Sequence, residues 1–144
     1  MRKKFLATLA IASGLLPLPL AAAEPGDPRQ LLCAVHTVSE CGHGAECQRV
    51  SAVDVNAPEF LLVDIAGRVV RATAASGADQ RTAAIENVRD VDGRLVLQGI
   101  EAAAEGGRQD VGWTLAIAGE TGRMVLTASG HEAGFVLFGS CLPL

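Results

Sequence analysis

Apolar and polar residues alternate in short runs along most of the chain, and turn residues separate the runs. In the run 111–118, for example, Trp113, Leu115 and Ile117 fall on one face of an extended strand. A period of two residues is typical of half-buried β-strands. The pattern predicts eight or nine strands, at 32–38, 48–53, 59–65, 68–73, 81–91, 94–100, 111–118, 123–129 and 135–141.

The connections between these strands are short and rich in turn residues. Asp92-Gly93 is a two-residue hairpin signal, and Ala66-Gly67 is a second tight link. No stretch shows a sustained helical period, because Gly106-Gly107 ends the Ala- and Glu-rich run 100–105 after little more than a turn. We therefore predict an all-β fold, an antiparallel meander of about eight strands that closes as a small barrel, with a β-sandwich as the alternative.

The N-terminal segment has the three parts of an export signal. Basic residues occupy positions 2–4, an apolar run covers 5–20, and three alanines at 21–23 precede a polar stretch. The apolar run is shorter than the roughly 20 residues of a membrane span, and prolines interrupt it. We predict a signal peptide (1–23, cleaved), a flexible leader (24–30) and a single β-domain (31–144), with no membrane span in the mature chain.

The predicted mature chain is acidic. Loss of the signal removes three basic residues and leaves nine, all arginine, against 16 acidic residues, a net charge of −7. Nucleic acids and anionic lipids bind clustered Lys and Arg, so the composition argues against both as partners. A basic partner is compatible with this charge, although a net charge of either sign also keeps an exported protein soluble.

Four cysteines follow the predicted signal, and an even number in a short exported chain indicates disulfides. Cys41 and Cys47 enclose five residues, two of them glycine, so a tight loop can bring their sulfurs together. This pairing leaves Cys33 with Cys141, which would join the first and last strands of a closed barrel. That bond would stabilise the fold by roughly 4–5 kcal/mol. We expect a periplasmic or secreted protein with both disulfides.

A metal site is the alternative interpretation of the same segment. His36, Cys41, His43 and Cys47 are soft or borderline ligands. Their spacing lacks the paired pattern of structural zinc sites, and an oxidising compartment removes free thiolates. We therefore predict no metal and no other cofactor.

The sequence contains no catalytic signature. We interpret His131 as a solvated turn residue, His43 as part of the disulfide loop, and His36 as half-buried on a strand with a hydrogen-bond partner. Motifs of serine hydrolases, P-loops, dinucleotide sites and calcium loops are absent. We predict that the protein is not an enzyme and has no catalytic or cofactor-binding residues.

Several segments together resemble a group of small exported proteobacterial proteins that end in a Phe-Gly-x-Cys strand. The group shares an N-terminal cysteine strand and a turn like Asn56-Ala57-Pro58, and it has no assigned activity. The resemblance therefore implies export and the fold, and no functional residue. Size and architecture also resemble the small periplasmic lysozyme inhibitors, whose tyrosine-containing motifs are absent from this tyrosine-free chain. The matching segments are 95–99, 112–117, 120–124 and 135–141.

These observations predict an exported β-domain that binds a protein partner or a small ligand, in an oligomeric state that they do not specify. Side chains often fill an eight-stranded barrel, and aromatic residues are few here, so a protein partner is favoured over a lipid. Two alternatives are a metal or enzymatic site around the Cys41–Cys47 loop, and a structural or stress component of the cell envelope.

Overall fold

The computed structural model describes residues 29–73, 81–102 and 110–144. The predicted signal peptide and most of the predicted leader lie outside these residues. The described residues form nine β-strands and no helix, which confirms the all-β prediction. The strands are β1 (Gln30–Gly42), β2 (Gln48–Val50), β3 (Phe60–Asp64), β4 (Val69–Thr73), β5 (Thr82–Val91), β6 (Arg94–Glu101), β7 (Val111–Ala118), β8 (Arg123–Ser129) and β9 (Ala133–Pro143).

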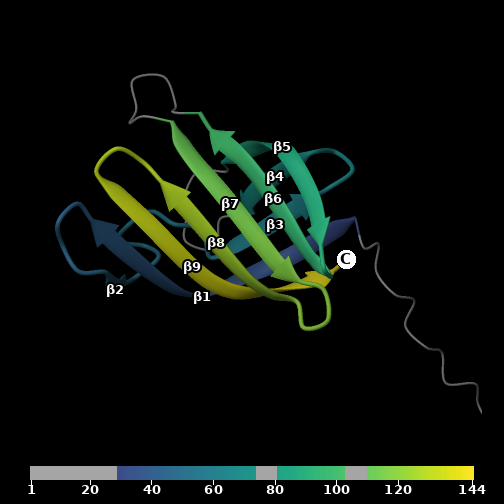
Figure 1. Cartoon of the computed structure of the whole chain (residues 1–144), viewed down its shortest axis with the longest axis horizontal. Helices are drawn as coiled ribbons and strands as arrows, with labels where there is room; N and C mark the ends of the chain where they lie inside the picture. Colours follow the sequence, from purple (N-terminus) through teal and green to yellow (C-terminus); the bar gives the residue numbers. More distant parts are fainter. Residues whose placement is uncertain (1–28, 74–80, 103–109) are drawn as a thin grey trace, which may run out of the picture.

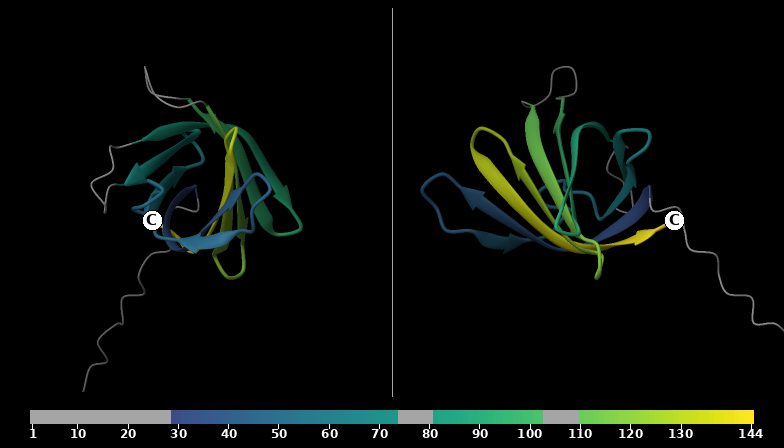
Figure 2. Two further views of the ribbon diagram at one scale, coloured as in Figure 1. Left: turned by 90° about the vertical axis from the view of Figure 1, so that its left-hand side faces the viewer. Right: turned by 45° about the vertical axis from the view of Figure 1, so that its right-hand side comes forward.

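Eight of the strands close into an antiparallel barrel (Figures 1 and 2). Neighbours in the order β1-β3-β4-β5-β6-β7-β8-β9 are hydrogen-bonded, and β9 pairs with β1 to complete the ring. The extra strand, β2, pairs with residues 38–40 of β1 and extends the β1–β2 hairpin beyond β3 (Figure 1). Of the two predicted architectures, the barrel is therefore the one observed.

The predicted strand bounds are accurate where the alternation is strong. β7 and β8 have the predicted bounds, and β1 and β9 extend beyond them. β2 is a short strand of three residues. At the β5–β6 turn, Asp92 and Gly93 both have positive φ, 50° and 74°, as a two-residue hairpin of this kind requires.

Apolar side chains fill the barrel interior. Leu97, Leu115, Met124 and Leu137 are each at most 2% exposed, and Trp113 packs with them. All of these residues lie on β6 to β9, and the core also includes inward side chains of β1, β3, β4 and β5. A filled interior of this kind is typical of small barrels.

A β-bulge in β1 reverses the predicted alternation. The register with β9 shifts between Val35 and Thr37, so His36 is an extra residue. Beyond the bulge Val38 is buried like Cys33, whereas a strict alternation places Thr37 on the face of Cys33. One inserted residue exchanges the two faces of a strand, which explains the error.

β5 contains a second bulge of the same kind. Its register with β6 shifts between Ile85 and Asn87, with Glu86 as the extra residue. Val88 therefore packs against the core, although the pattern predicted Asn87 on the face of Ile85.

Each bulge faces a glycine on the neighbouring strand. Val35 pairs with Gly139, and Ile85 pairs with Gly99. A Cβ atom at Gly139 would overlap the carbonyl oxygen of Ala34, and one at Gly99 would overlap the carbonyl oxygen of Ala84. We call these two places the β1–β9 corner and the β5–β6 corner, because a bulge opposite a glycine bends a sheet.

An approximate two-fold relation connects the two corners. Lowering every β5 residue number by 50 and raising every β6 number by 40 turns each β5–β6 pair into a β1–β9 pair. In the same way, each β6–β7 pair becomes a β9–β8 pair when the β7 number is raised by 11. Each β5–β4 pair becomes a β1–β3 pair when the β4 number is lowered by 9. Each position on one half of the barrel therefore has a structural counterpart on the other half.

Candidate functional site

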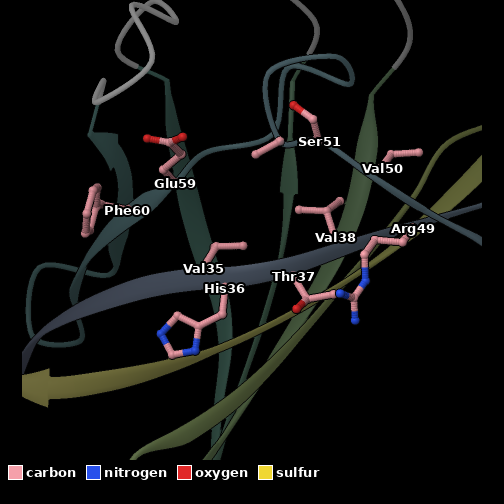
Figure 3. A pocket seen from close by; sticks show the side chains of 10 residues that line it. Val35, His36, Thr37, Val38, Arg49, Val50, Ser51, Glu59 and Phe60 are labelled. Carbon is pink, nitrogen blue, oxygen red and sulfur yellow. The ribbon is translucent and has the colours of Figure 1, made fainter.

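A notch opens in the barrel wall at the β1–β9 corner. β3 pairs with β1 as far as Ala34, and β2 begins to pair at Val38. The part of β1 between these points faces a cavity of about 320 Å³ (Figure 3). The residues that line the notch are Val35, His36, Thr37, Val38, Arg49, Val50, Ser51, Ala52, Glu59 and Phe60.

The two charged side chains of the notch, Arg49 and Glu59, lie on opposite sides of β1. His36 and Arg49 point to one side, whereas Glu59 and Ser51 lie on the other (Figure 3). His36 is exposed and has no hydrogen-bond partner among the described residues, so the prediction that it is half-buried and hydrogen-bonded is wrong. The reason is the bulge, which turns this extra residue away from the barrel.

At the β5–β6 corner, the guanidinium group of Arg68 binds the backbone of the bulge. Arg68 Nη1 donates to the carbonyl oxygens of Ile85 at 3.1 Å and Glu86 at 2.8 Å. The Arg68 carbonyl also accepts a hydrogen bond from the Ile85 N–H, at 2.9 Å. The side chain therefore binds the two carbonyls that the bulge exposes.

The two-fold counterpart of Arg68 is Glu59. The Glu59 carbonyl accepts a hydrogen bond from the Val35 N–H at 2.8 Å, just as the Arg68 carbonyl does at the other corner. A carboxylate has no proton to donate. Within the described part of the chain, no side chain donates to the carbonyls of Val35 and His36.

Replacement of Arg68 by glutamine should destabilise the protein by about 1 kcal/mol, because the bulge carbonyls lose a charged donor that is largely exposed to water. Arg71→Gln is the matched control, since Arg71 is exposed on the adjacent strand β4. The control should change the free energy of unfolding by less than about 0.5 kcal/mol. Urea denaturation of both variants measures the difference, and equal losses would contradict a capping role for Arg68.

The outer surface of β3, β1, β9 and β8 carries a group of exposed apolar side chains, which we call the outer patch. Leu32 faces Leu142 across β1 and β9, and Phe138 faces Val125 across β9 and β8. Between 37% and 71% of each side chain is exposed. The outer patch consists of Leu32, Phe60, Val125, Phe138 and Leu142.

Three of the five outer-patch positions have polar counterparts on the other half of the barrel, whereas Val69 is the counterpart of Phe60 and Ile100 is also exposed on that half. Thr82, Gln98 and Thr114 are the counterparts of Leu32, Phe138 and Val125. Gln98 Nε2 donates to Thr114 Oγ1 at 3.4 Å, beside a shallow hollow of about 360 Å³. The two halves therefore repeat the core but differ in their outer surface.

The four cysteines form the two predicted disulfides, Cys33–Cys141 and Cys41–Cys47. Both sulfurs of the Cys41–Cys47 loop are thus oxidised, and neither is a thiolate that could bind a metal. Residues 29–73, 81–102 and 110–144 contain no group of three or more His, Cys, Asp or Glu side chains placed to hold a metal ion. His43 and His131 are exposed, and the structure does not bring them together with His36.

No family model matches the chain, and neither the curated proteins nor the solved structures include a match. The resemblance to small exported proteobacterial proteins therefore stays a prediction. The two disulfides are compatible with an oxidising, exported compartment. No helix within the described segments has the length and apolar character that crossing a membrane would require.

The sequence reasoning did not find the notch or the outer patch. One signal was present: the sequence Val-Leu-x-Gly occurs at 96–99 and again at 136–139. The variable residue is Gln98 in the first copy and Phe138 in the second. The two copies therefore differ at this one position, where an aromatic residue stands in place of an amide.

Proposed function

We propose that this chain is an exported, non-enzymatic binding domain that docks a protein partner on the outer patch. The observation that carries the proposal is the difference between the two halves of the barrel. Three positions of the outer patch have polar counterparts, so the fold itself does not require apolar side chains there. Exposed apolar side chains gathered on neighbouring strands are typical of an interaction site.

Aromatic side chains strengthen the case for a protein partner. Phe60 and Phe138 are exposed on the same outer surface, although the chain has few aromatic residues. Such residues are enriched at the centres of protein interfaces. The filled barrel interior favours binding on the outside of the barrel over enclosure of a small ligand, and the net charge of the chain opposes pairing of two copies.

Export is part of this proposal. Two disulfides suit an oxidising compartment, and residues 1–23 have the composition of a cleaved signal. We therefore place the protein in the periplasm or outside the cell. Mass spectrometry of the exported protein should find a chain that begins at Glu24 and retains both disulfides.

The double variant Phe138→Gln/Val125→Thr tests the docking surface. It copies the residues that the chain itself carries at the matching positions of the β5–β6 corner, so the fold should persist. We expect chemical crosslinking in the native compartment to give one heteromeric product of fixed mass with the wild type. The yield should fall about tenfold in the variant, because two central apolar contacts are lost.

The matched control is Gln98→Asn/Thr114→Ser at the polar corner, which should crosslink like the wild type. Circular dichroism and thermal unfolding of all three proteins show whether the barrel is intact. Equal partner yields from the wild type and the outer-patch variant would refute the proposal. A crosslinked product made of two copies of this chain would assign the outer patch to self-association instead.

A further inference from the structure

The notch at the β1–β9 corner has the backbone of a cation site without the cation-bearing side chain. At the β5–β6 corner the same backbone arrangement binds the guanidinium of Arg68. Both bulges pair with a glycine. In each, the first bulge residue donates its N–H to the carbonyl of the residue before the next strand: Val35 to Glu59, before β3, and Ile85 to Arg68, before β4. By their register, the carbonyls of Val35 and His36 are the counterparts of those of Ile85 and Glu86.

We propose that the notch receives an arginine side chain of the partner protein. The guanidinium would donate to the carbonyl oxygens of Val35 and His36, as Arg68 donates to their counterparts. Glu59 lines the same cavity, and its negative charge attracts a guanidinium group. The inference rests on the proposed function in one respect, namely that the cation belongs to a protein partner.

The charges around the notch determine how such a side chain enters. Arg49 and His36 lie on one side of β1, and the positive charge of Arg49 would repel a cation that approached from there (Figure 3). Glu59 lies on the other side, next to Ser51. The guanidinium therefore enters from the Glu59 side, and the charge of Arg49 favours that direction over the opposite one.

The size and overall charge of the site agree with this occupant. A cavity of about 320 Å³ is ample for a guanidinium group and its methylene stem. The chain carries a formal net charge of −4, and −7 once the predicted signal is removed, so it attracts a basic partner at long range. Exposed Phe60 at the rim of the notch offers an apolar surface for the methylene stem.

NMR titration of the ¹⁵N-labelled exported chain with N-acetylarginine amide tests the inference directly. We expect saturable shifts of the backbone amides at 35–38 and 59. N-acetylcitrulline amide, which has the same shape and no charge, should produce no saturable shift at these positions. Equal responses to the two compounds would overturn the inference, because charge and not shape is the proposed basis of binding.

Two variants identify which charge matters. Glu59→Gln should weaken arginine-amide binding about threefold to fivefold, since an exposed charge pair is lost. Arg49→Gln should leave the binding unchanged or strengthen it. Loss of binding in Arg49→Gln with no change in Glu59→Gln would show that the notch is an anion site and would overturn the inference.

This experiment fails separately from the crosslinking experiment. A notch that ignores arginine amide, combined with partner loss in Phe138→Gln/Val125→Thr, removes the inference and leaves the proposed function in place. Specific binding of arginine amide without a partner that depends on the outer patch supports the cation site and refutes the proposed function.

Discussion

Replacement of Gly139 by alanine should destabilise the barrel by about 3 kcal/mol or more. The added Cβ would overlap the carbonyl oxygen of Ala34 and would lie 2.6 Å from Met124 Cε. The methionine side chain can move, but the carbonyl belongs to the bulged strand β1, which is fixed by its pairing with β9. Relief of the overlap therefore requires the β1–β9 corner to open.

Gly112→Ala is the control for this prediction. Gly112 lies in β7, and a Cβ there would meet only Ser129 Oγ at 3.8 Å, an ordinary contact distance. The control should change the free energy of unfolding by less than about 1 kcal/mol, and alanine can even favour the strand by reducing the entropy of the unfolded chain. Urea denaturation measures both variants. Equal stability of the two variants would show that the β1–β9 corner tolerates a side chain at position 139.

The strands could be predicted from local pattern, and the cysteines of the first and last strands favoured their closure into a barrel. In the runs 111–118 and 123–129 the large apolar residues of the inner face recur at every second position, and the bounds were predicted without error. The disulfide between Cys33 and Cys141 followed from the number of cysteines and from the position of the first and last strands. These features require no knowledge of register.

The bulges were not predicted, because their only mark in the sequence is a spacing of three residues, from Val35 to Val38 and from Ile85 to Val88. His36 and Glu86 read as ordinary members of their strands, and the faces assigned beyond them were reversed. The notch depends on the same information. It exists because β3 and β2 pair with different parts of β1, and only the register shows the gap between them.

The two-fold relation shows which positions have the same character in both halves of the barrel and which differ. Inward positions keep their apolar character across the relation: Leu97 corresponds to Leu137, and Leu115 to Leu126. The outer surface and the residue beside each bulge differ, with Phe138 in place of Gln98 and Glu59 in place of Arg68. One corner is closed by its own side chains, and the other is left open beside apolar surface. This asymmetry is the reason for proposing that a partner binds at the β1–β9 corner.

The disulfides show the same asymmetry, and removal of the one at the open corner should have a large effect. Cys33 faces Cys141 directly across β1 and β9, two positions before the bulge. The variant Cys33→Ala/Cys141→Ala should lose about 4–5 kcal/mol, since the bond closes a loop of 108 residues in sequence separation. Both sulfurs are also almost fully buried, so their loss leaves a small cavity in the core.

Cys41→Ala/Cys47→Ala is the comparison, because that bond closes a separation of six residues and should contribute about 2 kcal/mol. Denaturation of both variants gives the order of the two losses, and hydrogen exchange locates the change. Amides of β1 and β9 should exchange faster in Cys33→Ala/Cys141→Ala, whereas the β5–β6 corner, which has Arg68 and no disulfide, should stay protected. Uniform exchange at both corners would mean that the bond stabilises the whole barrel equally. A selective effect at β1 and β9 would mean that the disulfide stabilises the β1–β9 corner as Arg68 stabilises the β5–β6 corner. The disulfide makes no use of the bulge carbonyls, so the proposed partner could bind them.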